Sequence, residues 1–148
     1  MLTNMSPTVA SRTALSSGLR ISVMRLARRL RSERADHGLT LGQVSVLAGL
    51  ERHGPMTPGE VAAHEGIRPP SATRTLASLT DLGLVTRTPH PSDGRQVVIT
   101  ITGEARALLR EDRRRRDAWL AAALESLPAD ERAVLVAAAP ILDRLAGV

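Results

Sequence analysis

Two arginine side chains of this sequence have neighbours that suit recognition of a charged or hydrogen-bonding partner. Arg74 follows a Pro69-Pro70 pair by four residues, and Arg95 ends a loop rich in proline and glycine. A guanidinium group offers a rigid fork of donors that matches guanine O6 and N7 or the oxygens of a phosphate. Both arginines are therefore candidates for nucleic-acid contacts, although either could also be an ordinary solvated surface charge.

Further polar residues accompany these arginines. The hydroxyl groups of Ser71 and Thr73 lie near the expected start of a helix, where they either cap it or contact phosphate. Asp93 is expected to pair with Arg74 or Arg95, because an unpaired carboxylate would repel a phosphate backbone. The predicted DNA-contacting residues are Arg68, Pro70, Ser71, Thr73, Arg74, Ser78, Asp93 and Arg95.

A pair of short helices must position Arg74. Thr57, Pro58 and Glu60 have the spacing of an N-cap, a first-turn proline and a capping-box partner. Gly66 ends that helix, and the next is expected to begin near Pro70, where proline is tolerated. Ala72, Leu76 and Leu79 then share an apolar face, opposite Arg74. This arrangement predicts a helix-turn-helix with an outward-facing second helix.

A β-hairpin is expected to carry Arg95. Residues 84–87 and 96–101 are β-rich runs, and residues 89–95 between them form a loop punctuated by proline and glycine. The resulting wing would place Arg95 where a cation can enter the narrow, strongly negative minor groove of DNA. The whole motif is a winged helix-turn-helix.

The run from Leu39 to Leu108 resembles the MarR (multiple antibiotic resistance regulator) family of bacterial transcription factors. The resemblance lies in the order and spacing of Leu39-Thr40, Gln43, Val61-Ala62, Gly66-Ile67, Thr73-Arg74, the sequence LTDLGLVTR over residues 79–87, Asp93-Gly94-Arg95 and Ile101-Thr102-Gly103. It implies a mainly α fold with a small β-wing and with N- and C-terminal dimerisation helices. It also implies an obligate dimer, a palindromic operator and, often, release by a small phenolic or aromatic ligand.

The remaining segments are assigned from their composition and apolar spacing, and the dimerisation roles are implied by the resemblance. Residues 1–11 are expected to be a disordered arm, 12–38 a dimerisation helix, 39–102 the DNA-binding domain, and 103–148 a long linking helix followed by a C-terminal dimerisation helix. The helix after Thr40 is expected to bury Leu41, Val44, Leu47 and Ala48. The linking helix is polar on every side over residues 111–117, which predicts a solvent-exposed segment that connects two packed regions. The alternative interpretation is that its arginine run contacts DNA.

Composition limits the other possibilities. The formal net charge is +5 and there is no cysteine, which favours a polyanion partner only modestly and removes thiolate sites. No catalytic motif, cofactor or metal site is expected. Neither a membrane span nor a secretory signal is recognisable, so we expect a cytoplasmic, nucleoid-associated protein. A carboxylate effector, which the resemblance implies, would need an arginine and an apolar wall, for which the candidates are Arg20, Arg110, Arg116 and Trp119. The simpler interpretation of Trp119 is a core residue. The alternative function is an effector-independent architectural or nucleoid DNA-binding protein.

Overall fold

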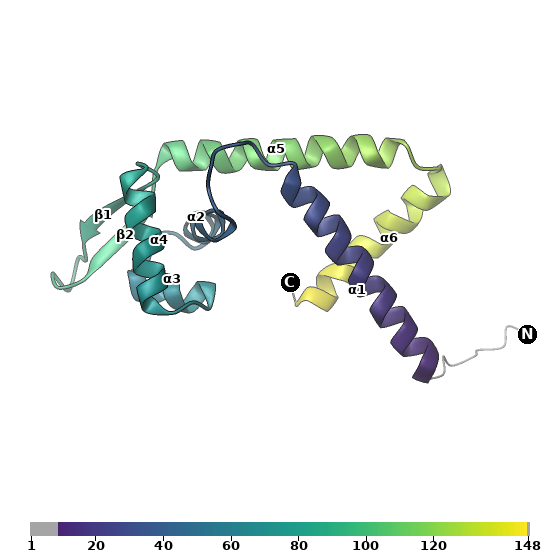
Figure 1. Cartoon of the computed structure of the whole chain (residues 1–148), viewed down its shortest axis with the longest axis horizontal. Helices are drawn as coiled ribbons and strands as arrows, with labels where there is room; N and C mark the ends of the chain where they lie inside the picture. Colours follow the sequence, from purple (N-terminus) through teal and green to yellow (C-terminus); the bar gives the residue numbers. More distant parts are fainter. Residues whose placement is uncertain (1–8, 148) are drawn as a thin grey trace, which may run out of the picture. The chain divides into compact units, whose positions relative to one another are not determined.

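The computed structural model describes residues 9–147 of the 148-residue chain. It is mainly helical, with one two-stranded antiparallel sheet (Figure 1). In chain order the elements are α1 (Val9–Ser32), α2 (Leu41–His53), α3 (Pro58–Glu65), α4 (Pro69–Asp81), β1 (Val85–Pro89), β2 (Val97–Ile101), α5 (Gly103–Glu125) and α6 (Ala129–Ala146). The predicted fold class is confirmed.

The chain divides into two compact units. One contains residues 35–114, which comprise α2, α3, α4, the β1–β2 hairpin and the first half of α5. The other contains α1, the second half of α5 and α6. The DNA-binding domain predicted over residues 39–102 thus lies within a slightly larger unit.

The unit of residues 35–114 is built around an aliphatic core. Its buried residues come from α2, α3, α4, the hairpin and the start of α5: Leu39, Val46, Leu47, Leu50, Met56, Val61, Leu76, Leu79, Leu84, Val85, Ile99, Ile101, Ala105 and Leu109. In the hairpin, Val85 pairs with Ile101 and Pro89 with Val97. Met56 and Ile99 exchange backbone hydrogen bonds of 3.1 and 2.8 Å, so the α2–α3 connection joins the open edge of β2.

Local sequence signals set the ends of these helices. Thr40 with Gln43 and Thr57 with Glu60 each form a complete capping box, which satisfies amide groups that have no partner inside the helix. Gly66 ends α3 in the left-handed conformation, with φ of 62°, which costs glycine little. Thr102 accepts a hydrogen bond from the Ala105 amide at the start of α5. The capping box predicted at Thr57 and Glu60 and the helix end predicted at Gly66 are confirmed.

Several predicted positions need correction. The helix α1 begins at Val9, so residues 9–11 are helical, whereas the rest of the expected arm, residues 1–8, lies outside the described residues. The same helix ends at Ser32, and α4 begins at Pro69, one residue earlier than expected. Leu41 is 57% exposed, because in the first turn of α2 it points away from the face that buries Val46, Leu47 and Leu50. Helical spacing alone cannot tell which of two neighbouring faces the core covers.

The helices of the second unit leave many large apolar side chains exposed. On α1 these are Leu15, Leu19, Ile21, Val23, Met24 and Leu26, and on α6 they are Val134, Leu135, Val136, Ile141, Leu142 and Leu145. Pro140 lies inside α6, as predicted. No residue of α6 is buried in the single chain, so its apolar residues remain without a covering layer there.

Candidate nucleic-acid interface

The helix α4 has one face in the core and the other in solvent. Ala72, Leu76 and Leu79 are 0% exposed, as their spacing predicted, and they hold the helix against the rest of its unit. Arg68, Pro70, Thr73 and Arg74 are exposed at its N-terminal end, and Ser71 is half-buried. Two prolines occupy the first turn, where the lack of their amide hydrogens does not break a helical hydrogen bond. These predicted contact residues therefore lie together at the N-terminal end of the helix, whereas Ser78 lies nearer its C-terminal end.

The hydroxyl groups of α4 are engaged in different ways. Thr73 Oγ1 donates to the carbonyl oxygen of Pro69 at 3.0 Å, which leaves its oxygen lone pairs able to accept. Ser78 is half-buried, and its Oγ accepts a hydrogen bond of 2.9 Å from Gln43 Nε2 of α2. The Ser78 side chain is thus turned toward α2 in its own domain. A contact between Ser78 and DNA stays a prediction.

The wing tip is held by Asp93 in an unexpected way. Its Oδ1 accepts from the Arg95 backbone amide at 3.1 Å, and its Oδ2 accepts from Gln96 Nε2 at 3.1 Å. Over residues 9–147 no ion pair joins Asp93 to an arginine, so the expected pairing with Arg74 or Arg95 is wrong. The carboxylate fixes the loop through an amide and a carboxamide, and the Arg95 guanidinium stays exposed.

Four exposed guanidinium groups lie on the second helix of the motif, its leading turn and the hairpin: those of Arg68, Arg74, Arg87 and Arg95. In the described part of the chain none of them forms an ion pair with a carboxylate. Arg87, on β1, was not among the predicted contact residues, although the alternation of Val85, Thr86 and Arg87 already placed it in a strand. These cations are free to meet phosphate or base edges.

The candidate effector residues occupy both units. Trp119 is half-buried on α5, and the guanidinium carbon of Arg29 on α1 lies 4.8 Å from the centre of its ring, a cation–π geometry. Arg29 was not selected from the sequence, since no local spacing relates it to Trp119. Arg20 and Arg110 are exposed, and Arg116 is half-buried. Arg110 belongs to the unit of residues 35–114, whereas the other three candidates belong to the second unit.

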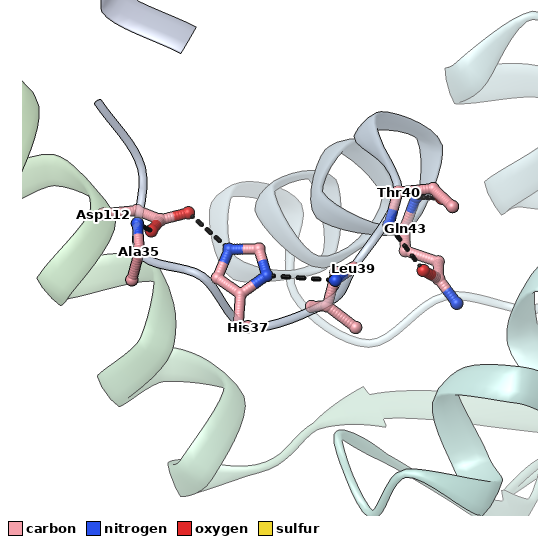
Figure 2. A network of polar contacts seen from close by, with 6 residues as sticks. All are labelled: Ala35, His37, Leu39, Thr40, Gln43 and Asp112. Carbon is pink, nitrogen blue, oxygen red and sulfur yellow. Dashed lines mark hydrogen bonds and ion pairs between the residues drawn. The ribbon is translucent and has the colours of Figure 1, made fainter. Parts of the chain in front are cut away.

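The middle of α5 is not solvated on every side, as its composition had suggested. Asp112 is 1% exposed. Its Oδ1 accepts from the Ala35 amide at 2.8 Å, and its Oδ2 lies 2.9 Å from His37 Nε2 (Figure 2). Its neighbour Arg113 forms a two-pronged ion pair with Glu51 of α2, with distances of 2.6 and 3.3 Å. The hydrogen bond from Arg113 lowers the pKa of Glu51. This stretch is therefore partly a docking surface for the segment before α2.

Two of the four histidines meet through the fold. The rings of His53 and His64 have centroids 4.1 Å apart and are tilted by 33°. Among the described residues no group of three or more histidine or acidic side chains is placed to hold a metal ion. We therefore assign no metal chemistry to this pair.

Three helices, of which the last exposes a cationic end, followed by an antiparallel hairpin with an exposed arginine, define a winged helix-turn-helix DNA-binding domain. Residues 37–96 match the family model described as MarR family. The chain belongs to the MarR family, and it is a DNA-binding transcriptional regulator.

Its relatives agree with this assignment. The HTH-type transcriptional regulator Mb0904 of Mycobacterium bovis is 44% identical over 128 residues, which cover 86% of this chain and 90% of the relative. The HTH-type transcriptional repressor MdtR of Bacillus subtilis is 28% identical over 136 residues, or 89% and 86% of the two chains. A crystal structure from Pseudomonas aeruginosa superposes with a TM-score of 0.82 at 36% identity, covering 93% of this chain and 97% of that one.

The helices of the described part include none that is long and apolar enough to span a membrane.

Proposed function

We propose that this regulator is a repressor that binds a palindromic operator as a homodimer, and that a small phenolic or aromatic ligand releases it. In this proposal the protein acts in the cytoplasm, on the nucleoid, and has no enzymatic activity. The observation that carries it is the exposed N-terminal end of α4, where Arg68, Thr73 and Arg74 stand opposite a fully buried apolar face.

The geometry supports distinct tasks for the two DNA-contacting parts. Arg74 on α4 would read a base edge in the major groove, where a bidentate guanidinium recognises guanine. Arg95 on the wing would enter the minor groove, with its loop fixed by Asp93. Arg68, Pro70, Ser71 and Thr73 would contact the phosphates or the sugar near the start of α4.

The exposed apolar residues of α1 and α6 support the homodimer. A monomer rarely leaves a large contiguous apolar surface in water, and such surfaces usually mark an interface. Two copies of one chain related by a two-fold axis would cover these residues with each other. That symmetry would be matched by an inverted repeat in the operator, with half-sites separated by about one helical turn.

Repression and ligand release rest on other support. The name of the Bacillus subtilis relative describes a repressor, and a repressor needs a means of release. The half-buried ring of Trp119 with the guanidinium of Arg29 above it offers an apolar wall beside a cation. Arg20, Arg110 and Arg116 remain the other candidates for pairing with an effector carboxylate.

Selection of bound sequences from a pool of random duplexes tests the function. We expect an enriched inverted repeat, bound at least about 10³-fold more tightly than random DNA at physiological salt. Titration of small aromatic acids into the complex with that duplex then tests release. If the selection enriches no sequence while binding falls steeply with salt, the protein is an architectural DNA-binder and the proposed operator recognition is wrong.

A further inference from the structure

A line of polar contacts runs from the buried Asp112 on α5 to Gln43 on α2 (Figure 2), and a further hydrogen bond joins Gln43 to Ser78 on the second helix of the helix-turn-helix. Asp112 binds His37, and His37 Nδ1 accepts from the Leu39 amide at 3.2 Å. The next amide, that of Thr40, donates to Gln43 Oε1 at 2.7 Å, and Gln43 Nε2 donates to Ser78 Oγ on α4 at 2.9 Å. We call this series of residues, from Asp112 to Ser78, the polar chain. All of its members lie within the unit of residues 35–114.

The hydrogen-bond roles along the polar chain are determined by its backbone amides. Because the Leu39 amide can only donate, His37 Nδ1 must be the unprotonated, accepting nitrogen. The hydrogen of the neutral imidazole is then on Nε2 and is donated to Asp112 Oδ2. Since Oδ1 accepts from the Ala35 amide, both oxygens of Asp112 act as acceptors, which is the role of an ionised carboxylate. One arrangement of protons therefore satisfies every member.

At the Gln43–Ser78 end of the polar chain, the partners also determine which atom donates and which accepts. Gln43 uses its carboxamide oxygen on Thr40, which leaves its NH₂ group for Ser78. Gln43 is thus both the capping-box partner at the start of α2 and the polar tie between α2 and α4. The contacts span 75 residues from His37 to Asp112 and 35 from Gln43 to Ser78, so each end fixes a tertiary arrangement.

We propose that His37, Gln43 and Ser78 are positioning residues for DNA recognition, which set the orientation of α4 relative to α2 and α5 through the polar chain anchored on Asp112. Apolar packing of Leu76 and Leu79 holds α4 in place, but such packing is not directional, whereas hydrogen bonds restrict both distance and angle. Arg74 lies on the face of α4 opposite Leu76 and Leu79, and a bidentate contact with a base requires a narrowly defined position of its guanidinium group. The proposal rests on the operator recognition proposed above, and it gives Ser78 a role inside the domain.

Two substitutions of His37 divide the polar chain at different points. In His37→Asn the carboxamide oxygen replaces Nδ1 and can still accept from Leu39, but the side chain is too short to reach Asp112. In His37→Gln the longer carboxamide can donate to Asp112, but it no longer accepts from Leu39. We expect each variant to lower the affinity ratio between the enriched inverted-repeat duplex and a shuffled duplex of the same composition about tenfold, the effect of roughly one lost hydrogen bond.

Ser78→Ala removes the hydrogen bond between Gln43 and Ser78. Combined with His37→Asn, it tests whether the two residues affect the affinity ratio through the same contacts, which general loss of stability would not produce. In the Ser78→Ala background, adding His37→Asn should change the ratio less than about twofold, because the disturbance no longer reaches α4. Glu51→Gln is the matched control, since it removes the ion pair of another contact between α2 and α5 outside the polar chain. It should leave the ratio of the wild type unchanged. Thermal unfolding of each variant establishes that the protein is folded at the assay temperature.

The outcomes separate the inference from the function on which it rests. If the wild type prefers the enriched duplex and the His37 variants prefer it equally, the inference is overturned and operator recognition stands. Additive effects of His37→Asn and Ser78→Ala also overturn it, since they show that the two residues act independently. If the wild type binds both duplexes equally, operator recognition fails, and the inference fails with it. If the His37 variants do not fold, Gln43→Met replaces them. It should lower the affinity ratio in the wild type and change it less than about twofold in the Ser78→Ala background; an unchanged ratio or additive effects overturn the inference.

Discussion

The exposed arginines of α4 and the wing differ in what surrounds them, and this difference predicts different effects on binding. Arg74 stands on a helix fixed by a buried face, whereas Arg95 stands on a loop held by Asp93. A base reader loses discrimination when truncated, whereas a minor-groove and phosphate contact loses affinity for all sequences.

Arg74→Ala should therefore cost roughly 1–3 kcal/mol of operator affinity and relax the preference at one base pair in each half-site. Arg95→Ala should weaken binding to operator and random duplexes more evenly, and it should lessen the salt dependence. Binding isotherms of both variants on operator variants, at two salt concentrations, give the answer. If Arg95→Ala alone changes base preference, the roles of the two residues are reversed.

The Glu51–Arg113 pair predicts a pH dependence of stability. Its hydrogen bond from Arg113 lowers the folded-state pKa of Glu51 below the ordinary value of 4.5. A lowered folded-state pKa contributes stability above the ordinary value, and that contribution is lost as the pH falls through the folded-state pKa. Glu51→Gln should therefore lower the melting temperature at neutral pH, and this difference should shrink as the pH falls below 4.5. The effect should be small because the pair is partly exposed to solvent. Melting curves from pH 7 to pH 3 test this; a difference that grows with acidity contradicts it.

At the scale of the elements, α3 depends on its cap more than the longer helices do. It has eight residues, and Thr57 accepts from the Glu60 amide while the Glu60 carboxylate accepts from the Thr57 amide. The hydrogen bond from the Thr57 amide lowers the pKa of Glu60. A helix this short is not stable by itself, so its ends matter.

Thr57→Ala should reduce the free energy of unfolding by about 1 kcal/mol, the usual effect of losing a hydroxyl N-cap. Thr57→Ser is the matched control, because it keeps the capping hydroxyl and should lie within about 0.5 kcal/mol of the wild type. Urea denaturation followed by circular dichroism measures both variants. Equal losses for alanine and serine would show that the methyl group, and not the cap, contributes the stability.

At the scale of the whole molecule, the exposed apolar residues of α1 and α6 predict assembly. Leu26 and Leu135 are each 46% exposed in the single chain, and burial of a leucine typically contributes about 1.5–3 kcal/mol. Leu26→Glu and Leu135→Glu should each shift the protein from dimer to monomer, since every substitution acts twice in a symmetric dimer.

Sedimentation equilibrium over a range of protein concentrations measures this shift. Leu41→Glu serves as the control: Leu41 is also exposed, but it begins α2 in the other unit, where an acidic residue is favourable near the helix N-terminus. That variant should remain a dimer. A wild type that sediments as a monomer at every concentration would refute the proposed assembly.

Much of the fold follows from short-range sequence signals. The threonine caps of α2, α3 and α5, the prolines that open α3 and α4, and the apolar spacing of Ala72, Leu76 and Leu79 all act within one or two helical turns. Their effects can be read from the sequence because the groups involved are neighbours in the chain. The exposure of Arg74 opposite the core face follows from the same spacing.

The sequence by itself thus determined the helices, the hairpin and the exposed end of α4, whereas the tertiary structure decided which polar groups meet. The burial of Asp112 against Ala35 and His37, the tie between Gln43 and Ser78, and the Arg29 guanidinium over Trp119 join residues far apart in the chain. No local pattern marks such partners, and a charged residue in a polar stretch looks solvated until another segment covers it. The contacts of Asp112 and Gln43 form only when the apolar core of residues 35–114 brings distant segments together, because the hydrophobic effect that drives packing is not directional and does not select individual polar pairs.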